Sequence, residues 1–216
     1  MTEKKGLSAL DVLKSGPVIP VIVIRNPDHA VPLAQALLAG GVTVLEITLR
    51  SDAALEAIRR IRAELPDVLV GAGTVLSGRD LHAVTEVGGH FAISPGLTPN
   101  LLAAARQESI PLIPGVASAS ELMLALEAGL TELKFFPAQA AGGVEMLKSF
   151  NSPFPQVTFC PTGGITLQNY KEYLSLKNVA CVGGSWLVPA DKIEQREWSA
   201  ITRLAQEAVA GAAGAF

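Results

Sequence analysis

One lysine of this chain interrupts an apolar segment. Lys134 lies within Glu132-Leu-Lys-Phe-Phe-Pro137, whereas the other lysines fall in the N-terminal segment, on expected helices or in loops. Burying an ammonium group is costly unless a carboxylate pairs with it or the group gives up its proton. A neutral lysine amine attacks a ketone carbon and forms an imine. Lys134 is therefore the nucleophile of a site or half of a structural ion pair, and its position alone leaves both open.

A second set of polar residues shares one face of an expected strand. Glu46, Thr48 and Arg50 alternate with apolar residues over 45–49. An alternation with period two places the two sets on opposite faces of a strand. A carboxylate can move protons, and an arginine binds a carboxylate through two parallel hydrogen bonds. An internal ion pair is the alternative, but a further buried charge at Lys134 favours a site.

Glycines follow three other apolar segments. In Gly71-Ala-Gly-Thr-Val75, Leu76 occupies the place of the third glycine of a dinucleotide fingerprint, so we interpret these glycines as room for another group to approach. Thr74 offers a hydroxyl there. The pairs in Cys160-Pro-Thr-Gly-Gly-Ile165 and Val182-Gly-Gly-Ser-Trp186 let backbone N–H groups approach a phosphate. One pair indicates an ordinary turn, but two predict a phosphate site.

The elements that position these residues recur about every 23 residues, the length of one βα unit. Eight apolar segments have the character of strands: 18–24, 43–49, 68–75, 91–94, 110–114, 132–137, 157–161 and 179–184. Amphipathic helical patterns separate them. Ser51 and Asp52 are expected helix caps, Ser118-x-x-Glu121 is an expected capping box, and Gly88-Gly89 is an expected helix end.

This alternation, without a linker, predicts a single (β/α)8 barrel, or TIM barrel, over residues 1–216. Segment 7–15 is expected to be an extra N-terminal helix covering the barrel floor, and 211–216 a frayed tail. An open doubly wound sheet is the alternative. In such barrels the active site lies at the C-terminal ends of the strands, and phosphates bind after the last two. The two glycine pairs fall in those two places.

Composition narrows the class of protein. The chain of 216 residues carries 17 Lys and Arg against 20 Asp and Glu, and a charged fraction of 17% weakly favours an oligomer. No basic cluster exceeds Arg59-Arg60-x-Arg62, so we expect no nucleic-acid partner. No apolar run approaches the roughly 18 residues of a membrane span, and the N-terminus lacks a signal-peptide pattern, so we expect a cytoplasmic protein with no membrane partner.

Cysteine and histidine contents predict neither a disulfide framework nor a metal site. Cys160 and Cys181 lie in apolar, strand-like runs and are interpreted as core residues. His29, His82 and His90 have no zinc-binding spacing, and none lies at the C-terminal end of an expected strand. A covalent lysine mechanism is therefore favoured over a metal-dependent enolate mechanism.

Six motifs, in order along nearly the whole chain, resemble those of 2-keto-3-deoxy-6-phosphogluconate (KDPG) aldolases, bacterial enzymes of the Entner–Doudoroff pathway that are often also 4-hydroxy-2-oxoglutarate (KHG) aldolases. They are Glu46-Ile-Thr-Leu-Arg50, Gly71-Ala-Gly-Thr-Val75, Ser94-Pro-Gly96, Lys134-Phe-Phe-Pro-Ala138, Cys160-Pro-Thr-Gly-Gly-Ile165 and Gly183-Gly-Ser-Trp-Leu187. The resemblance implies a class I, Schiff-base lyase that acts on a keto-acid phosphate, uses no metal or cofactor and forms homotrimers.

The resemblance also implies roles for single residues. Lys134 corresponds to the Schiff-base lysine and Glu46 to a proton shuttle that acts through water. Arg50 and Thr74 correspond to the residues that bind the substrate carboxylate. The remaining correspondences are a phosphate site and a pocket lining, formed respectively by Gly163, Gly164, Gly184 and Ser185 and by Pro95, Phe136 and Thr162. Gln139 departs from the family, where glutamate is frequent.

Two other functions compete with this one. A phosphosugar isomerase or epimerase on the same fold would use the glycine pairs and a carboxylate, but it needs no lysine buried in a strand. A non-catalytic barrel that binds phosphorylated metabolites would explain the glycines and leave the buried charges without a purpose. Trapping of an imine with borohydride separates the aldolase from both.

Overall fold

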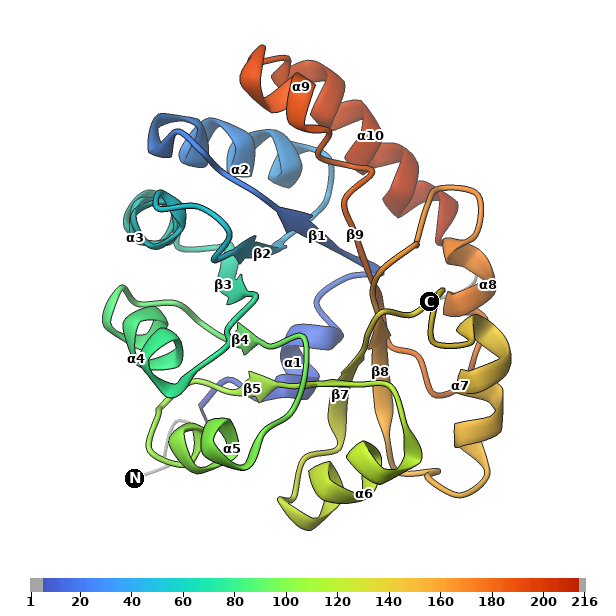
Figure 1. The fold of residues 1–216 in the computed structure, drawn as a ribbon. Helices are drawn as coiled ribbons and strands as arrows, with labels where there is room; N and C mark the ends of the chain where they lie inside the picture. Colours follow the sequence, from blue (N-terminus) through green and yellow to red (C-terminus); the bar gives the residue numbers. More distant parts are fainter. Residues whose placement is uncertain (1–5, 214–216) are drawn as a thin grey trace, which may run out of the picture.

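The structure is a computed structural model that describes residues 6–213. Its parallel strands form a curled sheet with helices arranged around the outside (Figure 1). The strands are β1 (Val18–Ile22), β2 (Val44–Thr48), β3 (Leu69–Gly73), β4 (Ala92–Ile93), β5 (Leu112–Ile113), β6 (Gly115–Val116), β7 (Glu132–Phe135), β8 (Thr158–Pro161) and β9 (Val182–Gly184). Each of the eight segments expected to be strands contains one, so the alternating pattern is confirmed.

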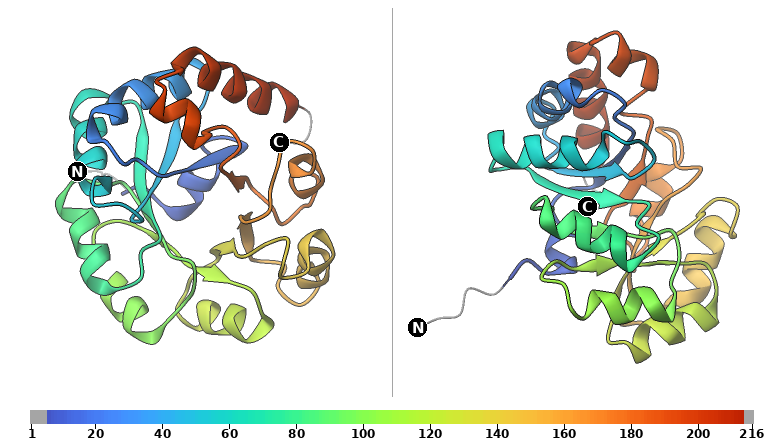
Figure 2. Two further views of the ribbon diagram at one scale, coloured as in Figure 1. Left: turned by 45° about the horizontal axis from the view of Figure 1, so that its top comes forward. Right: turned by 60° about the vertical axis from the view of Figure 1, so that its left-hand side comes forward.

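The helices follow the strands in chain order, and Figure 2 shows them around the sheet from two further sides. They are α1 (Ala9–Leu13), the 3-10 helix η1 (Pro27–His29), α2 (Ala30–Ala39), α3 (Ala54–Glu64), α4 (Gly78–Glu86), α5 (Pro99–Ala105), α6 (Ala119–Glu127), α7 (Gly143–Asn151), α8 (Tyr170–Leu174), α9 (Ala190–Glu194) and α10 (Trp198–Gly211). Of the tail expected to fray, Gly211 ends α10 and 214–216 lie outside the described residues. Within residues 6–213, no helix is both long and apolar enough to cross a membrane.

The strands pair in two sheets, and every pairing is parallel. One sheet has the order β5-β4-β3-β2-β1-β9 and the other β6-β7-β8. The segment expected to be one strand at 110–114 ends at Pro114, after which β6 starts a new ladder with β7. Proline has no N–H to donate, which explains the division. Isolated bridges, Phe159 with Val179 and Thr162 with Gly183, connect the β8 and β9 segments.

Apolar side chains form two layers, one between sheet and helices and one inside the curl. The inner cluster includes Ile19, Val44 and Ile113 from the strands and Val12 and Leu13 from α1. Ser15, just after α1, accepts a hydrogen bond from the hydroxyl of Thr43, just before β2. Helix α1 therefore packs near the N-terminal ends of the strands and leaves their C-terminal ends for polar groups.

Both cysteines belong to the inner cluster, as predicted. Cys160 and Cys181 are free thiols, and both are buried. Burial raises the pKa of the Cys181 thiol well above its ordinary value, because an apolar environment disfavours the thiolate. Since the thiolate is the reactive form, this cysteine is a packing residue.

Helix ends follow the local signals in two places and depart from them in a third. Ser118 and Glu121 form the predicted capping box of α6, and α4 ends before Gly88, which has a positive φ of 79°. The expected caps of α3 are wrong. Its N-cap is Ala53, and the Ser51 hydroxyl instead donates to the carbonyl of Ile24. That bond ties the loop after β2 to the segment after β1.

Candidate active site

The predicted nucleophile and carboxylate meet inside the curled sheet. Lys134 comes from β7 and Glu46 from β2, and the lysine Nζ donates a hydrogen bond to Oε1 at 3.1 Å. Their side chains are only 7% and 1% exposed. The two strands belong to different sheets, so the pair spans the interior. A carboxylate at this distance both balances a buried ammonium and can accept its proton.

Space for this carboxylate comes from a glycine on β3. A Cβ atom at Gly73 would collide with the carboxylate of Glu46. The glycine therefore allows the close approach that the sequence predicted. The ring of Phe136 also contacts the amine, since the Lys134 Nζ lies over its face at 5.3 Å from the centroid. The amine thus has both a carboxylate and an aromatic ring as neighbours.

Arg50 is held in place by Thr48, which lies two residues earlier on the same face of the strand. The Arg50 Nε–H donates to the Thr48 hydroxyl oxygen at 3.1 Å, and that hydroxyl donates to the carbonyl of Ile22 at 2.8 Å. Thr48 is buried, whereas Arg50 is exposed. Within residues 6–213, the terminal nitrogens of the guanidinium make no hydrogen bond. They are free for a planar anion such as a carboxylate.

Thr74 directly follows β3 in a left-handed backbone conformation, with φ of 58°. Branched side chains rarely adopt this region. Conformations of this kind persist where the surrounding structure holds them, and they cluster at functional sites. The strand end that carries Thr74 is also the one whose Gly73 receives Glu46. Thr74 is therefore adjacent in the chain to the glycine that leaves room for Glu46.

The residues predicted to bind phosphate gather at the ends of β8 and β9. Gly163 and Gly164 follow β8 with φ values of 100° and 76°, while Gly184 ends β9 and Ser185 follows it. The bridge between Thr162 and Gly183 places the two segments side by side. Pro95 follows β4, so the predicted pocket residues also lie at C-terminal strand ends, as Phe136 does after β7.

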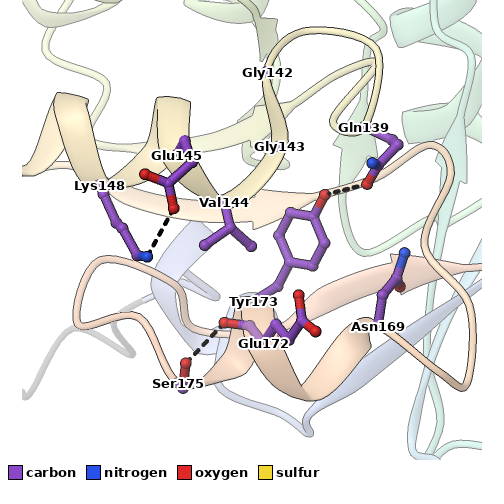
Figure 3. Close-up of a pocket in the computed structure, with 10 residues that line it drawn as sticks. All are labelled: Gln139, Gly142, Gly143, Val144, Glu145, Lys148, Asn169, Glu172, Tyr173 and Ser175. Carbon is purple, nitrogen blue, oxygen red and sulfur yellow. Dashed lines mark hydrogen bonds and ion pairs between the residues drawn. The ribbon is translucent and has the colours of Figure 1, made fainter.

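The chain also has a pocket of 670 Å³ away from the Lys134–Glu46 pair. It lies between α7 and α8 (Figure 3). Gln139, Asn169 and Tyr173 are among its lining residues, and the hydroxyl of Tyr173 donates to the Gln139 Oε1 at 2.9 Å.

In the part of the chain that the structure describes, no three His, Cys, Asp or Glu residues are grouped so that they could hold a metal ion.

Known proteins are similar to this chain in both sequence and fold. The model of the KDPG and KHG aldolase family matches residues 10–204. The chain belongs to this aldolase family. The KHG/KDPG aldolase of Escherichia coli K12 is 58% identical over 95% of this chain and 96% of its own. The 2-dehydro-3-deoxy-phosphogluconate aldolase of Dickeya dadantii is 60% identical over the same shares.

Two solved structures of the aldolase family bear on the chemistry of the site. A KDPG aldolase from Legionella pneumophila, with pyruvate captured at low pH as a covalent carbinolamine intermediate, has a TM-score of 0.92 and 54% identity, covering 93% of this chain and 98% of that one. The Zymomonas mobilis enzyme with 3-phosphoglycerate has a TM-score of 0.89 and 49% identity, covering 94% and 95%.

Sequence reasoning missed contacts that support these aldolase-family motifs. The strand pattern placed Thr48 on the correct face but gave its hydroxyl no partner. Asn169 received no role, although its Nδ2 donates to the carbonyl of Gly164 at 3.0 Å. An asparagine just before a helix is an ordinary capping signal, which conceals any other use. The hydrogen bond between Tyr173 and Gln139 joins residues that are 34 positions apart, so no local sequence pattern predicts it.

Proposed function

We propose that this chain is a class I aldolase that cleaves 2-dehydro-3-deoxy-6-phosphogluconate to pyruvate and glyceraldehyde 3-phosphate in the Entner–Doudoroff pathway. The observation that carries the proposal is the buried pair of Lys134 and Glu46, 3.1 Å apart, in a member of the KDPG and KHG aldolase family. The relatives named KHG/KDPG aldolase support a second substrate, 4-hydroxy-2-oxoglutarate, which gives pyruvate and glyoxylate.

The first half of the reaction follows from the position of the amine. Neutral Lys134 attacks C2 of the keto acid, and the carbinolamine loses water to give an imine. Glu46 accepts the proton of the C4 hydroxyl through a water molecule, and the C3–C4 bond breaks. The bonding electrons move to the imine nitrogen, leaving an enamine of pyruvate on Lys134, and glyceraldehyde 3-phosphate is released.

The second half restores the enzyme. The proton held by Glu46 returns to C3 of the enamine, and water hydrolyses the resulting imine to pyruvate and free Lys134. Arg50 and Thr74 hold the carboxylate throughout, which keeps C2 in front of the amine. At the far end of the substrate, the phosphate group binds Gly163, Gly164, Gly184 and Ser185, while Pro95, Phe136 and Thr162 line the pocket between.

Borohydride reduction in the presence of pyruvate tests the imine directly. Reduction converts the imine to a stable secondary amine, so peptide mapping is expected to find a pyruvate-derived adduct on the peptide that contains Lys134. Borohydride without pyruvate is the control. Binding of pyruvate without any adduct would overturn the aldolase and favour a phosphosugar isomerase, an epimerase or a non-catalytic phosphometabolite-binding barrel.

We infer further that the protein is a single (β/α)8 barrel domain that works as a cytoplasmic homotrimer. The two bridges between the β8 and β9 segments, and the short step from β5 to β6 across Pro114, support closure of the sheet. A charged fraction of only 17% supports an oligomer. Light scattering of the purified protein tests the trimer, and a monomeric mass would contradict it.

The anchored arginine gives a separate prediction. Thr48→Val removes the hydroxyl that accepts from Arg50 and donates to Ile22, at almost constant volume. The KM for keto acids is expected to rise roughly fivefold to tenfold, with a smaller change in kcat, because the loss of one hydrogen bond frees the guanidinium.

Thr48→Ser is the matched control, since it retains the hydroxyl and loses only a methyl group. It is expected to restore most of the affinity that Thr48→Val loses. Steady-state kinetics with 4-hydroxy-2-oxoglutarate measure both variants. A valine variant whose kcat falls while its KM stays at the wild-type value would show that Thr48 does not act through the carboxylate-binding arginine.

A further inference from the structure

Two carbonyl groups of the predicted phosphate-binding segment are tied to one side. The carbonyl of Gly163 accepts from the backbone N–H of Gln139 at 3.0 Å. The carbonyl of Gly164 accepts from the Asn169 Nδ2 at 3.0 Å. Both donors lie on the side of α7 and α8, where they line the pocket in Figure 3.

Tying the carbonyls fixes where the amide protons point. In a planar trans peptide, the C=O and the following N–H lie on opposite sides. The N–H groups of Gly164 and Ile165 are therefore directed away from α7 and α8. Within residues 6–213, neither N–H has a hydrogen-bond acceptor. Successive free amides on one side of a glycine turn form a concave site for an anion.

Asn169 is the one side chain among these donors, and its orientation is fixed at both ends. Its Oδ1 accepts from the backbone N–H of Thr166 at 2.8 Å. Because Oδ1 takes that proton, Nδ2 faces the Gly164 carbonyl. The amide serves both partners through two different atoms, whereas a carboxylate would have no proton to donate to the Gly164 carbonyl.

Gln139 supports the same segment by packing. A Cβ atom at Gly164 would collide with the Cβ of Gln139, so the glycine lies directly against this side chain. The buried hydroxyl of Tyr173 holds the far end of Gln139 (Figure 3). The glycine turn therefore packs against Gln139, on the side opposite its free amides.

We propose that Asn169 is a positioning residue for the phosphate end of the substrate. It holds the Gly164 carbonyl outward, so that the N–H of Ile165 stays directed at the phosphate without any contact between Asn169 and substrate. The proposal rests on the proposed function, because it assigns the phosphate of a keto-acid phosphate to this turn. It adds a residue from the helical layer to a site otherwise formed at strand ends.

Two variants test the proposal. Asn169→Asp keeps the acceptor for Thr166 and removes the donor to Gly164, whereas Asn169→Ala removes both. Each is expected to raise the KM for 2-dehydro-3-deoxy-6-phosphogluconate about tenfold, because the amides lose their fixed direction. The KM and kcat for 4-hydroxy-2-oxoglutarate, which has no phosphate, are expected to stay within about twofold of wild type. Ser185→Ala, which removes a predicted phosphate contact, is the benchmark for such selectivity.

Gln168→Glu is the matched control for the charge of the aspartate variant. Gln168 is exposed, lies next to Asn169 and changes from amide to carboxylate in the same way. Equal losses on both substrates in the Asn169 variants, no change on either, or the same selectivity in Gln168→Glu would each overturn the proposal. Failure of the proposed function is distinguishable, because the wild-type chain would then cleave neither substrate.

Discussion

Lys134→Ala is expected to abolish cleavage of both keto acids, with kcat falling by roughly 10⁴-fold or more. The reaction needs an amine that forms a covalent bond to C2, and within the described residues no other lysine is buried as Lys134 is. Borohydride with pyruvate should then leave no adduct on the peptide over 132–137. Turnover close to the wild-type rate would exclude the imine route.

The same change has a cost in stability that must be separated from the loss of chemistry. It leaves the carboxylate of Glu46, only 1% exposed, without its partner. Breaking a buried ion pair from one side destabilises a protein by about 3–5 kcal/mol. The double variant Lys134→Met with Glu46→Gln removes both charges at similar volume. We expect the thermal unfolding temperature of the double variant to be closer to that of the wild type than the temperature of Lys134→Ala is, while the double variant stays inactive.

The residues that the sequence predicted best are those that break a local rule. A charged side chain in an apolar strand is unfavourable by itself, so the sequence pattern alone marks Lys134 and Glu46 as candidates for a site. Gly73 was informative for the same reason, because glycine weakens a strand unless another group needs the space. In each case the violation is local, and its compensation is a contact inside the curled sheet, between Lys134 and Glu46 or between Glu46 and Gly73.

Strand ends could not be predicted from hydrophobicity. The expected strand at 18–24 ends at Ile22 in the structure, although Ile24 is fully buried. Loops at this end of the sheet are covered by neighbouring elements, so apolar residues continue past the last ladder hydrogen bond. Ser51 shows the complementary error, because its hydroxyl was expected to cap a helix and instead donates to the carbonyl of Ile24, in the segment after β1.

The hydrogen bonds that hold the predicted site residues in place could not be predicted from the sequence, for a different reason. Asn169 and Gly164 are close in sequence, but only the folded turn shows that the Gly164 carbonyl faces outward. Thr48 and Ile22 are 26 positions apart and meet because β1 and β2 are neighbours in the sheet. Such partners follow from the register of strands, which residue types alone do not determine.

Glu46→Gln is expected to separate formation of the imine from the proton transfers that follow it. The amide has the same shape as the carboxylate and fits the space beside Gly73, but it cannot accept a proton. We expect kcat to fall about 10²- to 10⁴-fold, the range of a lost general acid–base group. Pyruvate should still be trapped on Lys134 by borohydride.

Exchange of the pyruvate methyl protons with deuterated water isolates the step that Glu46 performs. The exchange needs the imine to lose a proton from C3 and regain one, so it uses the carboxylate without any cleavage of a carbon–carbon bond. Glu46→Asp is the matched control, because it keeps the acid–base group and shortens its reach from β2. Slow exchange with intact trapping in Glu46→Gln, partly restored in Glu46→Asp, is expected. Unchanged exchange would remove Glu46 from the proton path and leave it only as the partner that lets a lysine be buried.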